Sequence, residues 1–159
     1  MQHNHDDRPT VTPPLPVALV VDDSFAARAR IAQLLLLGGW RVQQAVGMDD
    51  ALRLAALIGP ELVVTDMVMR RGHGATLMRR LREQGCTARF LVVTARRTQQ
   101  VRALAASSGA LACLGKPVDP RLFVDVMRGL SATLAPRRPP SRRPPRPLPS
   151  PARARPRCT

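Results

Sequence analysis

The eight residues LVVTDMVM, from Leu62 to Met69, decide the fold class of this chain. Their first half, residues 62–65, has no charged residue and no alternation of apolar with polar side chains. A short run of this kind is typical of a strand in a parallel sheet that helices cover on both faces. Asp66 follows at once, so the strand is predicted to end on a carboxylate.

The same pattern recurs on both sides of this segment. Short apolar runs alternate with longer segments whose apolar residues return every three or four positions, as in amphipathic helices. The predicted strands are residues 17–21, 40–46, 62–65, 90–93 and 110–114. The predicted helices run from a cap at Ser24 to Gly38, from Asp49 or Asp50 to Ile58, from Ala75 to Gln84, from Arg97 to Ser107 and from Pro120 to Thr133. These alternations predict an α/β fold with a doubly wound, five-stranded parallel sheet.

Charge and proline are distributed unevenly along the chain, whose formal net charge is +14. Residues 135–159 hold eight Arg and no acid, with many prolines and almost no large apolar side chain. Such a segment has too little apolar surface to offset its ordering entropy. We therefore expect a flexible leader over residues 1–16, a folded domain over residues 17–134 and a disordered Arg/Pro-rich tail over residues 135–159.

The cysteines and the apolar runs bear on the compartment. Cys86, Cys113 and Cys158 are odd in number and far apart, which favours free thiols in a reducing compartment over disulfides or a zinc site. The longest aliphatic run, residues 34–37, is far too short to span a membrane, and the N-terminus is acidic where a signal peptide would be basic. We expect a cytoplasmic protein without membrane insertion.

Polar and charged residues stand at the carboxyl ends of the predicted strands, the edge where ligands gather in such sheets. They are Asp22, Asp23, Asp66, Thr94 and Lys116. Three carboxylates held together repel by several kcal/mol per pair, at an effective dielectric of about 20 and a separation of about 4 Å. An acidic, all-oxygen site without His or Cys indicates Mg²⁺. Lys116 is the single lysine among 25 basic residues, which suggests a narrow site that a planar guanidinium would not fit.

Four motifs at these strand ends resemble, in order, the signature set of bacterial response-regulator receiver domains. They are Asp22-Asp23, Asp66-Met67-Val68-Met69, Thr94-Ala95 and Lys116-Pro117. The resemblance covers about 118 of the 159 residues. It implies the flavodoxin-like receiver fold and the function of a phosphoacceptor switch in a two-component phosphorelay, a role that is not enzymatic beyond the domain's own phosphorylation and dephosphorylation.

The resemblance also implies the roles of individual residues. Asp66 would accept the phosphoryl group from a sensor histidine kinase or a phosphotransfer protein. The Mg²⁺ ligands would be Asp66, Asp23 directly, Asp22 directly or through water, and the backbone carbonyl of Val68. Lys116 would pair with Asp66 and then with a phosphoryl oxygen.

Two further expectations concern the groups beside Lys116. The hydroxyl of Thr94 would bond another phosphoryl oxygen, and the Lys116–Pro117 peptide bond would be cis. The signal would pass to an unknown downstream protein through protein–protein contacts.

The chain departs from the family pattern at three places. Arg70-Arg71 follows Met69 where a proline is usual, and His73-Gly74 replaces the common Asp-Gly. Cys113 stands three residues before the lysine, where the family usually has Tyr, Phe or His as a rotating switch. We interpret Cys113 as a small buried hydrophobic residue, which leaves open how phosphorylation is reported.

Two alternative functions remain at this stage. One is a pseudo-receiver, a binding module of the same fold that is never phosphorylated. The other is association with nucleic acid through the basic tail, which would be sensitive to salt and largely independent of sequence. The 25 residues after the domain are too few for a DNA-binding output domain, so the sequence favours a stand-alone receiver.

Overall fold

The computed structural model describes residues 14–133, with side chains placed for residues 14–130. The predictions for the leader and the tail therefore fall outside the described residues, apart from residues 14–16. The elements are β1 (Val17–Val21), α1 (Phe25–Leu37), β2 (Arg41–Ala45), α2 (Met48–Ile58), β3 (Leu62–Thr65), β4 (Val68–Met69), β5 (Gly72–His73), α3 (Gly74–Glu83), β6 (Arg89–Thr94), α4 (Gln99–Ser107), β7 (Ala112–Gly115) and α5 (Pro120–Thr133). No helix among them is both long enough and apolar enough to cross a membrane.

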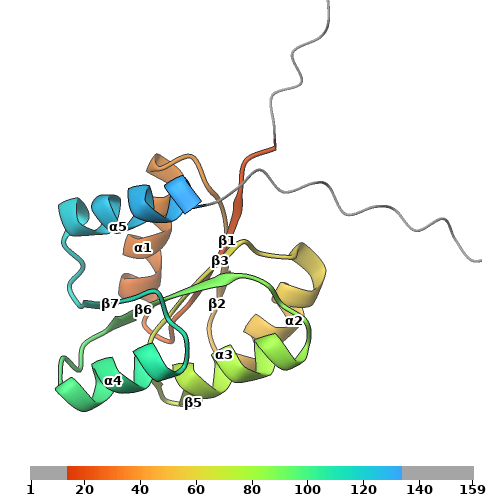
Figure 1. Cartoon of the computed structure of the whole chain (residues 1–159). Helices are drawn as coiled ribbons and strands as arrows, with labels where there is room; N and C mark the ends of the chain where they lie inside the picture. The colour runs from red at the N-terminus through yellow and green to blue at the C-terminus, as the bar shows by residue number, and fades with distance from the viewer. Residues whose placement is uncertain (1–13, 134–159) are drawn as a thin grey trace, which may run out of the picture.

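Five parallel strands form the central sheet in the order β2-β1-β3-β6-β7. This order places later strands on both sides of β1, which is the doubly wound, flavodoxin-like arrangement. The predicted fold class is confirmed. Because all five strands run in the same direction, their carboxyl ends meet at one edge of the sheet (Figure 1).

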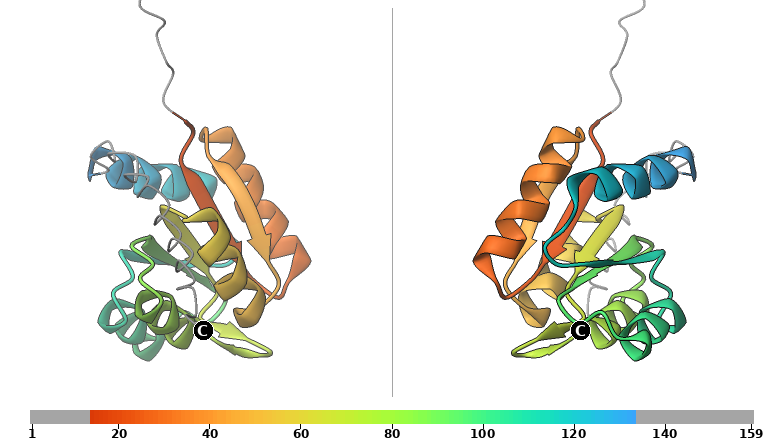
Figure 2. Two further views of the ribbon diagram at one scale, coloured as in Figure 1. Left: turned by 90° about the vertical axis from the view of Figure 1, so that its right-hand side faces the viewer. Right: turned by 90° about the vertical axis from the view of Figure 1, so that its left-hand side faces the viewer.

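The helices form two layers, one on each face of the sheet (Figures 1 and 2). The alternation of side chains along β1 shows the division. Ala18 and Val20 pack in the cluster with α1 and α5, whereas Leu19 and Val21 pack in the cluster with α2, α3 and α4. All four are fully buried, which explains why the strand is a continuous apolar run and not an alternating one.

Most predicted boundaries of helices and strands lie within two residues of the observed ones. The start of α2 is one place where the predicted and the observed boundary differ. We expected Asp49 or Asp50 to open this helix, but it begins at Met48 after an extended Gly47. Both aspartates instead lie in the first turn, where their charge favours the helix dipole. At α1 the expected cap is present, since Ser24 Oγ accepts a hydrogen bond from the Ala27 N–H at 3.4 Å.

A small hairpin follows β3 that the sequence did not predict. Residues 68–69 pair in antiparallel fashion with residues 72–73, across a turn made by Arg70 and Arg71. Gly72 permits this turn with a φ of 129°, a conformation that side chains with a Cβ rarely adopt. The hairpin projects beyond the carboxyl ends of the central strands (Figure 2).

Candidate functional site

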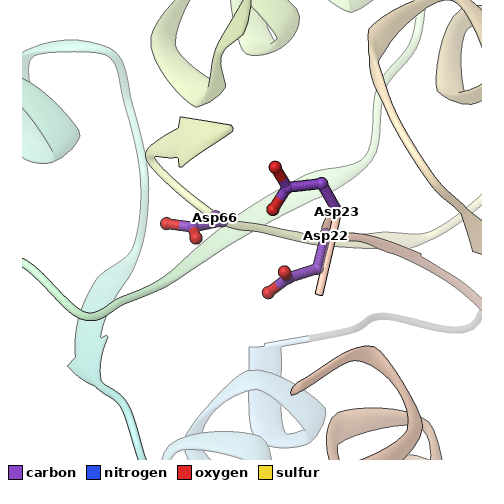
Figure 3. Close-up of side chains that lie close together, drawn as sticks. All are labelled: Asp22, Asp23 and Asp66. Atoms are coloured by element: carbon purple, nitrogen blue, oxygen red, sulfur yellow. The ribbon is translucent and has the colours of Figure 1, made fainter. Parts of the chain in front are cut away.

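Neighbouring strands bring the three predicted carboxylates together. Val21 and Thr65 are paired in the register of β1 with β3, so residues 22 and 66 leave the sheet at the same level. The Asp66 N–H donates to the Val21 carbonyl at 3.0 Å, which continues this pairing. One oxygen each of Asp22, Asp23 and Asp66 lies within 4.8 Å of the others. Figure 3 shows the side chains of Asp22 and Asp23 diverging from neighbouring positions beside the side chain of Asp66.

Asp22 is the most enclosed of the three, with no exposed surface. Its Oδ1 accepts a hydrogen bond from the Ser24 N–H at 2.8 Å, and its backbone carbonyl accepts one from Arg28 at 2.7 Å. Its Oδ2 faces the Lys116 ammonium at 2.5 Å, an ion pair without the alignment of a good hydrogen bond. Lys116 therefore supplies the charge that makes burial of this carboxylate tolerable.

Lys116 lies between two of the acids. Its Nζ is 2.7 Å from Asp66 Oδ2 and 2.5 Å from Asp22 Oδ2. Burial works to lower the pKa of Lys116, but the close contacts with Asp22 and Asp66 and their negative charges outweigh it and hold the pKa above its ordinary value. The Lys116–Pro117 peptide bond is cis, as the resemblance implied.

Asp23 is held from outside the sheet by the hairpin. Its Oδ2 accepts a hydrogen bond from the Arg70 N–H at 2.8 Å, and the Arg70 Nε lies 3.6 Å away. The Arg70 side chain is 86% exposed, so its ion pair adds little, and the backbone hydrogen bond is the contact that fixes the carboxylate.

Asp66 is 7% exposed and is bound on both carboxylate oxygens. Its Oδ2 accepts from Lys116, and its Oδ1 accepts from the Val68 N–H at 3.1 Å. This places Val68 against the carboxylate through its N–H, while the metal-ligand role predicted for its carbonyl stays a prediction.

Gly74, at the start of α3, approaches Asp66 more closely than any other residue type could. Its N–H donates to the Met67 carbonyl at 2.9 Å. A Cβ there would overlap the Asp66 carbonyl oxygen and come within 3.1 Å of the Met67 Cα. The sequence places Gly74 in the His73-Gly74 pair eight positions after the acid, but the pattern alone does not predict its close approach to Asp66.

Thr94 is buried at the end of β6, and its hydroxyl bonds within its own loop. Oγ1 accepts a hydrogen bond from the Arg96 N–H at 3.3 Å. Its carbonyl accepts from the Lys116 N–H at 2.9 Å, so β6 holds the residue that carries the ammonium.

Cys113 on β7 is half-buried and packs against the cluster that contains α4. Burial raises the pKa of its thiol, and the charge of Arg102 offsets part of that rise. Cys113 is thus less buried than our interpretation of it as a small buried hydrophobic residue expected, although it does pack against an apolar cluster.

The acidic cluster suits a hard divalent cation. Its donors are all carboxylate oxygens, and at the observed spacing each pair repels by roughly 3–4 kcal/mol for an effective dielectric of about 20. One ammonium offsets only one of the three negative charges. The remaining excess of negative charge, with oxygen donors alone, fits Mg²⁺ better than zinc or copper.

Known proteins agree with this architecture. The family model of the response regulator receiver domain matches residues 18–128. Response regulator MprA of Mycolicibacterium vanbaalenii is 36% identical over 112 residues, which are 70% of this chain and 48% of that protein. Response regulator MprA of Mycobacterium sp. (strain KMS) is 35% identical over 118 residues, covering 74% of this chain and 51% of that protein. The chain spans about half the length of these curated relatives.

Solved structures show the same fold. The chemotaxis protein CheY4 of Vibrio cholerae superposes with a TM-score of 0.68 at 22% identity, covering 73% of this chain and 98% of that one. A response regulator protein from Burkholderia multivorans has a TM-score of 0.60 at 31% identity, covering 77% of this chain and 99% of that one. This chain therefore belongs to the response-regulator family, and residues 18–128 are a receiver domain of two-component signalling.

Proposed function

We propose that Asp66 accepts a phosphoryl group and that this transfer switches the protein in a two-component phosphorelay. The observation that carries the proposal is the position of the Lys116 ammonium, 2.7 Å from Oδ2 of Asp66, whose carboxylate is clustered with those of Asp22 and Asp23. A lone acid at a strand end is often only a helix cap. An acid that is bound to a lysine and lies within a cluster of acids is equipped for phosphoryl transfer.

We assign Mg²⁺ to the acidic cluster, held by Asp22, Asp23, Asp66 and the Val68 carbonyl. When bound, the ion would supply the positive charge that phosphoryl oxygens need in the transition state. The burial of Asp22 and the hydrogen bond from Arg70 to Asp23 support this assignment, because they fix the carboxylates before any ligand arrives.

The transfer itself needs little more than positioning. A carboxylate oxygen of Asp66 forms a bond to phosphorus while the bond from phosphorus to the donor breaks. The donor's histidine nitrogen, or its oxygen in an acyl phosphate, leaves with the electron pair. Lys116 remains beside the acceptor and pairs with a phosphoryl oxygen, and the Thr94 hydroxyl leaves the Arg96 N–H to bond another.

The natural donor would be a sensor histidine kinase or a phosphotransfer protein, and a downstream protein would recognise the phosphorylated state. We place these events in the cytoplasm. The protein would not be an enzyme with a separate substrate, since it acts only on its own acyl phosphate. These assignments rest on family membership and on the site.

The proposal is tested by the intact mass of the protein after incubation with acetyl phosphate. With Mg²⁺ present the mass should rise by one phosphoryl group, and excess chelator should prevent the gain. A protein that folds, binds Mg²⁺ and still gains no mass under donor excess would instead be a pseudo-receiver.

A further inference from the structure

The backbone of Lys116 is bound on both sides by one short segment, residues 94–97, at the end of β6 and in the loop that leads to α4. Its N–H donates to the Thr94 carbonyl at 2.9 Å. Its carbonyl accepts a hydrogen bond from the Arg97 Nη2 at 2.8 Å. The residue whose ammonium lies between Asp22 and Asp66 is thus fixed at both of its peptide groups by the same short segment.

Arg97 reaches this carbonyl because the residue before Lys116 has no side chain. The Arg97 guanidinium packs directly on Gly115, so that a Cβ at position 115 would overlap Nε and come within 2.7 Å of Cζ. The backbone of Gly115 does not have a positive φ, so an alanine could adopt its conformation. What Gly115 provides is space for the guanidinium.

We propose that Arg97 is a positioning residue for the phosphoacceptor site, which acts by holding the Lys116 carbonyl so that the ammonium stays between Asp22 and Asp66. This inference rests on the proposed function of Asp66. Arg97 does not touch the acceptor itself, and its effect passes through the backbone of Lys116.

The same contact connects the acceptor site to α4. Arg97 is followed directly by Thr98, whose side chain caps α4 by accepting from the Val101 N–H at 3.3 Å. A movement at the start of α4 would therefore pull on Arg97, and through it on Lys116. Because coupling between sites is reciprocal, a shift of Lys116 upon phosphorylation would act on α4 by the same route.

Three substitutions distinguish the effect of the Arg97 contact on Lys116 from the effect of the Arg97 charge. Arg97→Ala removes the contact and the charge, whereas Gly115→Ala expels the guanidinium and keeps the charge. Arg128→Ala is the control for loss of charge, because Arg128 is exposed and equally charged and lies on α5. Each variant is phosphorylated with acetyl phosphate over a range of donor concentrations, and the carbonyl ¹³C shift of Lys116 is recorded by NMR without donor.

We expect both Arg97→Ala and Gly115→Ala to lower the maximal phosphorylation rate about tenfold, with little change in the donor concentration at half-maximal rate. Both should also shift the Lys116 carbonyl resonance in the same direction, and Arg128→Ala should change neither quantity. A normal maximal rate in Arg97→Ala, or an equal loss in Arg128→Ala, would overturn the proposal.

The NMR measurement distinguishes this proposal from the function on which it rests. If the wild-type protein accepted no phosphoryl group, the proposed function would fail. An unchanged Lys116 carbonyl shift in both Arg97→Ala and Gly115→Ala would instead show that Arg97 does not hold Lys116, whatever the protein's activity.

Discussion

The Nζ of Lys116 lies 2.7 Å from Oδ2 of Asp66, although 50 residues separate the two in the sequence. They follow β7 and β3, which are not neighbours in the sheet because β6 lies between them. The lysine side chain therefore extends past the end of β6 to reach the acid. A long, thin side chain with a compact charge suits this path.

Replacing Lys116 by Arg tests whether the shape of the cation matters. The planar guanidinium is larger than the ammonium whose Nζ lies 2.5 Å and 2.7 Å from two aspartate oxygens, so fitting it there would require the neighbouring groups to move. We expect Lys116→Arg to fold normally and to be phosphorylated by acetyl phosphate about tenfold more slowly. Arg121→Lys, the reverse exchange at an exposed position, is the control and should keep the wild-type rate. A wild-type rate in Lys116→Arg would mean that any cation suffices.

Gly74→Ala should destabilise the domain because the new Cβ would overlap the Asp66 carbonyl. We expect the free energy of unfolding in urea to fall by about 1–3 kcal/mol. Gly129→Ala is the matched control, since Gly129 lies within α5 and a Cβ there would meet nothing within 4 Å. That exchange should stabilise the helix by about 0.5–1 kcal/mol. Equal stability of Gly74→Ala and wild type would show that the backbone of Gly74 does not pack tightly against the Asp66 carbonyl.

The sequence predicted the part of the structure that depends on patterns of apolar residues. Both faces of the sheet are covered, so β1, β3 and β6 are apolar runs, and the acids that follow β1 and β3 meet because parallel strands share one carboxyl edge. The tertiary contacts of the loops were not predictable in this way. The β4–β5 hairpin has only two residues in each strand, too few for an alternating pattern.

Contacts between loops that are distant in the sequence are the other part of the structure that the sequence did not predict. The hydrogen bond from Arg70 to Asp23 joins residues 47 positions apart, and that from Arg97 to Lys116 joins residues 19 apart. An arginine in the sequence does not indicate such a contact, since arginine is the commonest charged residue of this chain and usually extends into solvent. Gly74 and Gly115 are informative only once the atom that fills the missing Cβ position is known.

Magnesium binding should depend more on Asp23 than on Asp22. The charge of Asp22 is already offset by Lys116 at 2.5 Å, whereas Asp23 is half-exposed and is bound mainly by a backbone N–H. We expect calorimetric titration to show a larger loss of Mg²⁺ affinity in Asp23→Ala than in Asp22→Ala. Asp125→Ala, at an exposed position on α5, should bind as the wild type does. Unchanged affinity in both site variants would show that the metal assignment is wrong.

The thiol of Cys113 should react slowly at neutral pH. Burial raises its pKa, so a smaller fraction is thiolate, the form that reacts. In a variant with Cys86 and Cys158 replaced by serine, the rate of alkylation by iodoacetamide should therefore rise with pH to a midpoint above the usual pKa of a thiol. Arg102→Ala removes a charge that favours the thiolate and should shift this rise to still higher pH. A shift to lower pH would contradict the assigned causes.

The identity of the phosphorylated residue is the most direct test of the account. After incubation with acetyl phosphate and Mg²⁺, borohydride reduces an aspartyl phosphate to homoserine, which peptide mass spectrometry locates in the chain. We expect homoserine at position 66 alone, and no conversion in Asp66→Asn under the same conditions. Conversion at Asp22 or Asp23, or undiminished conversion in Asp66→Asn, would contradict the assignment of Asp66 as the phosphoacceptor.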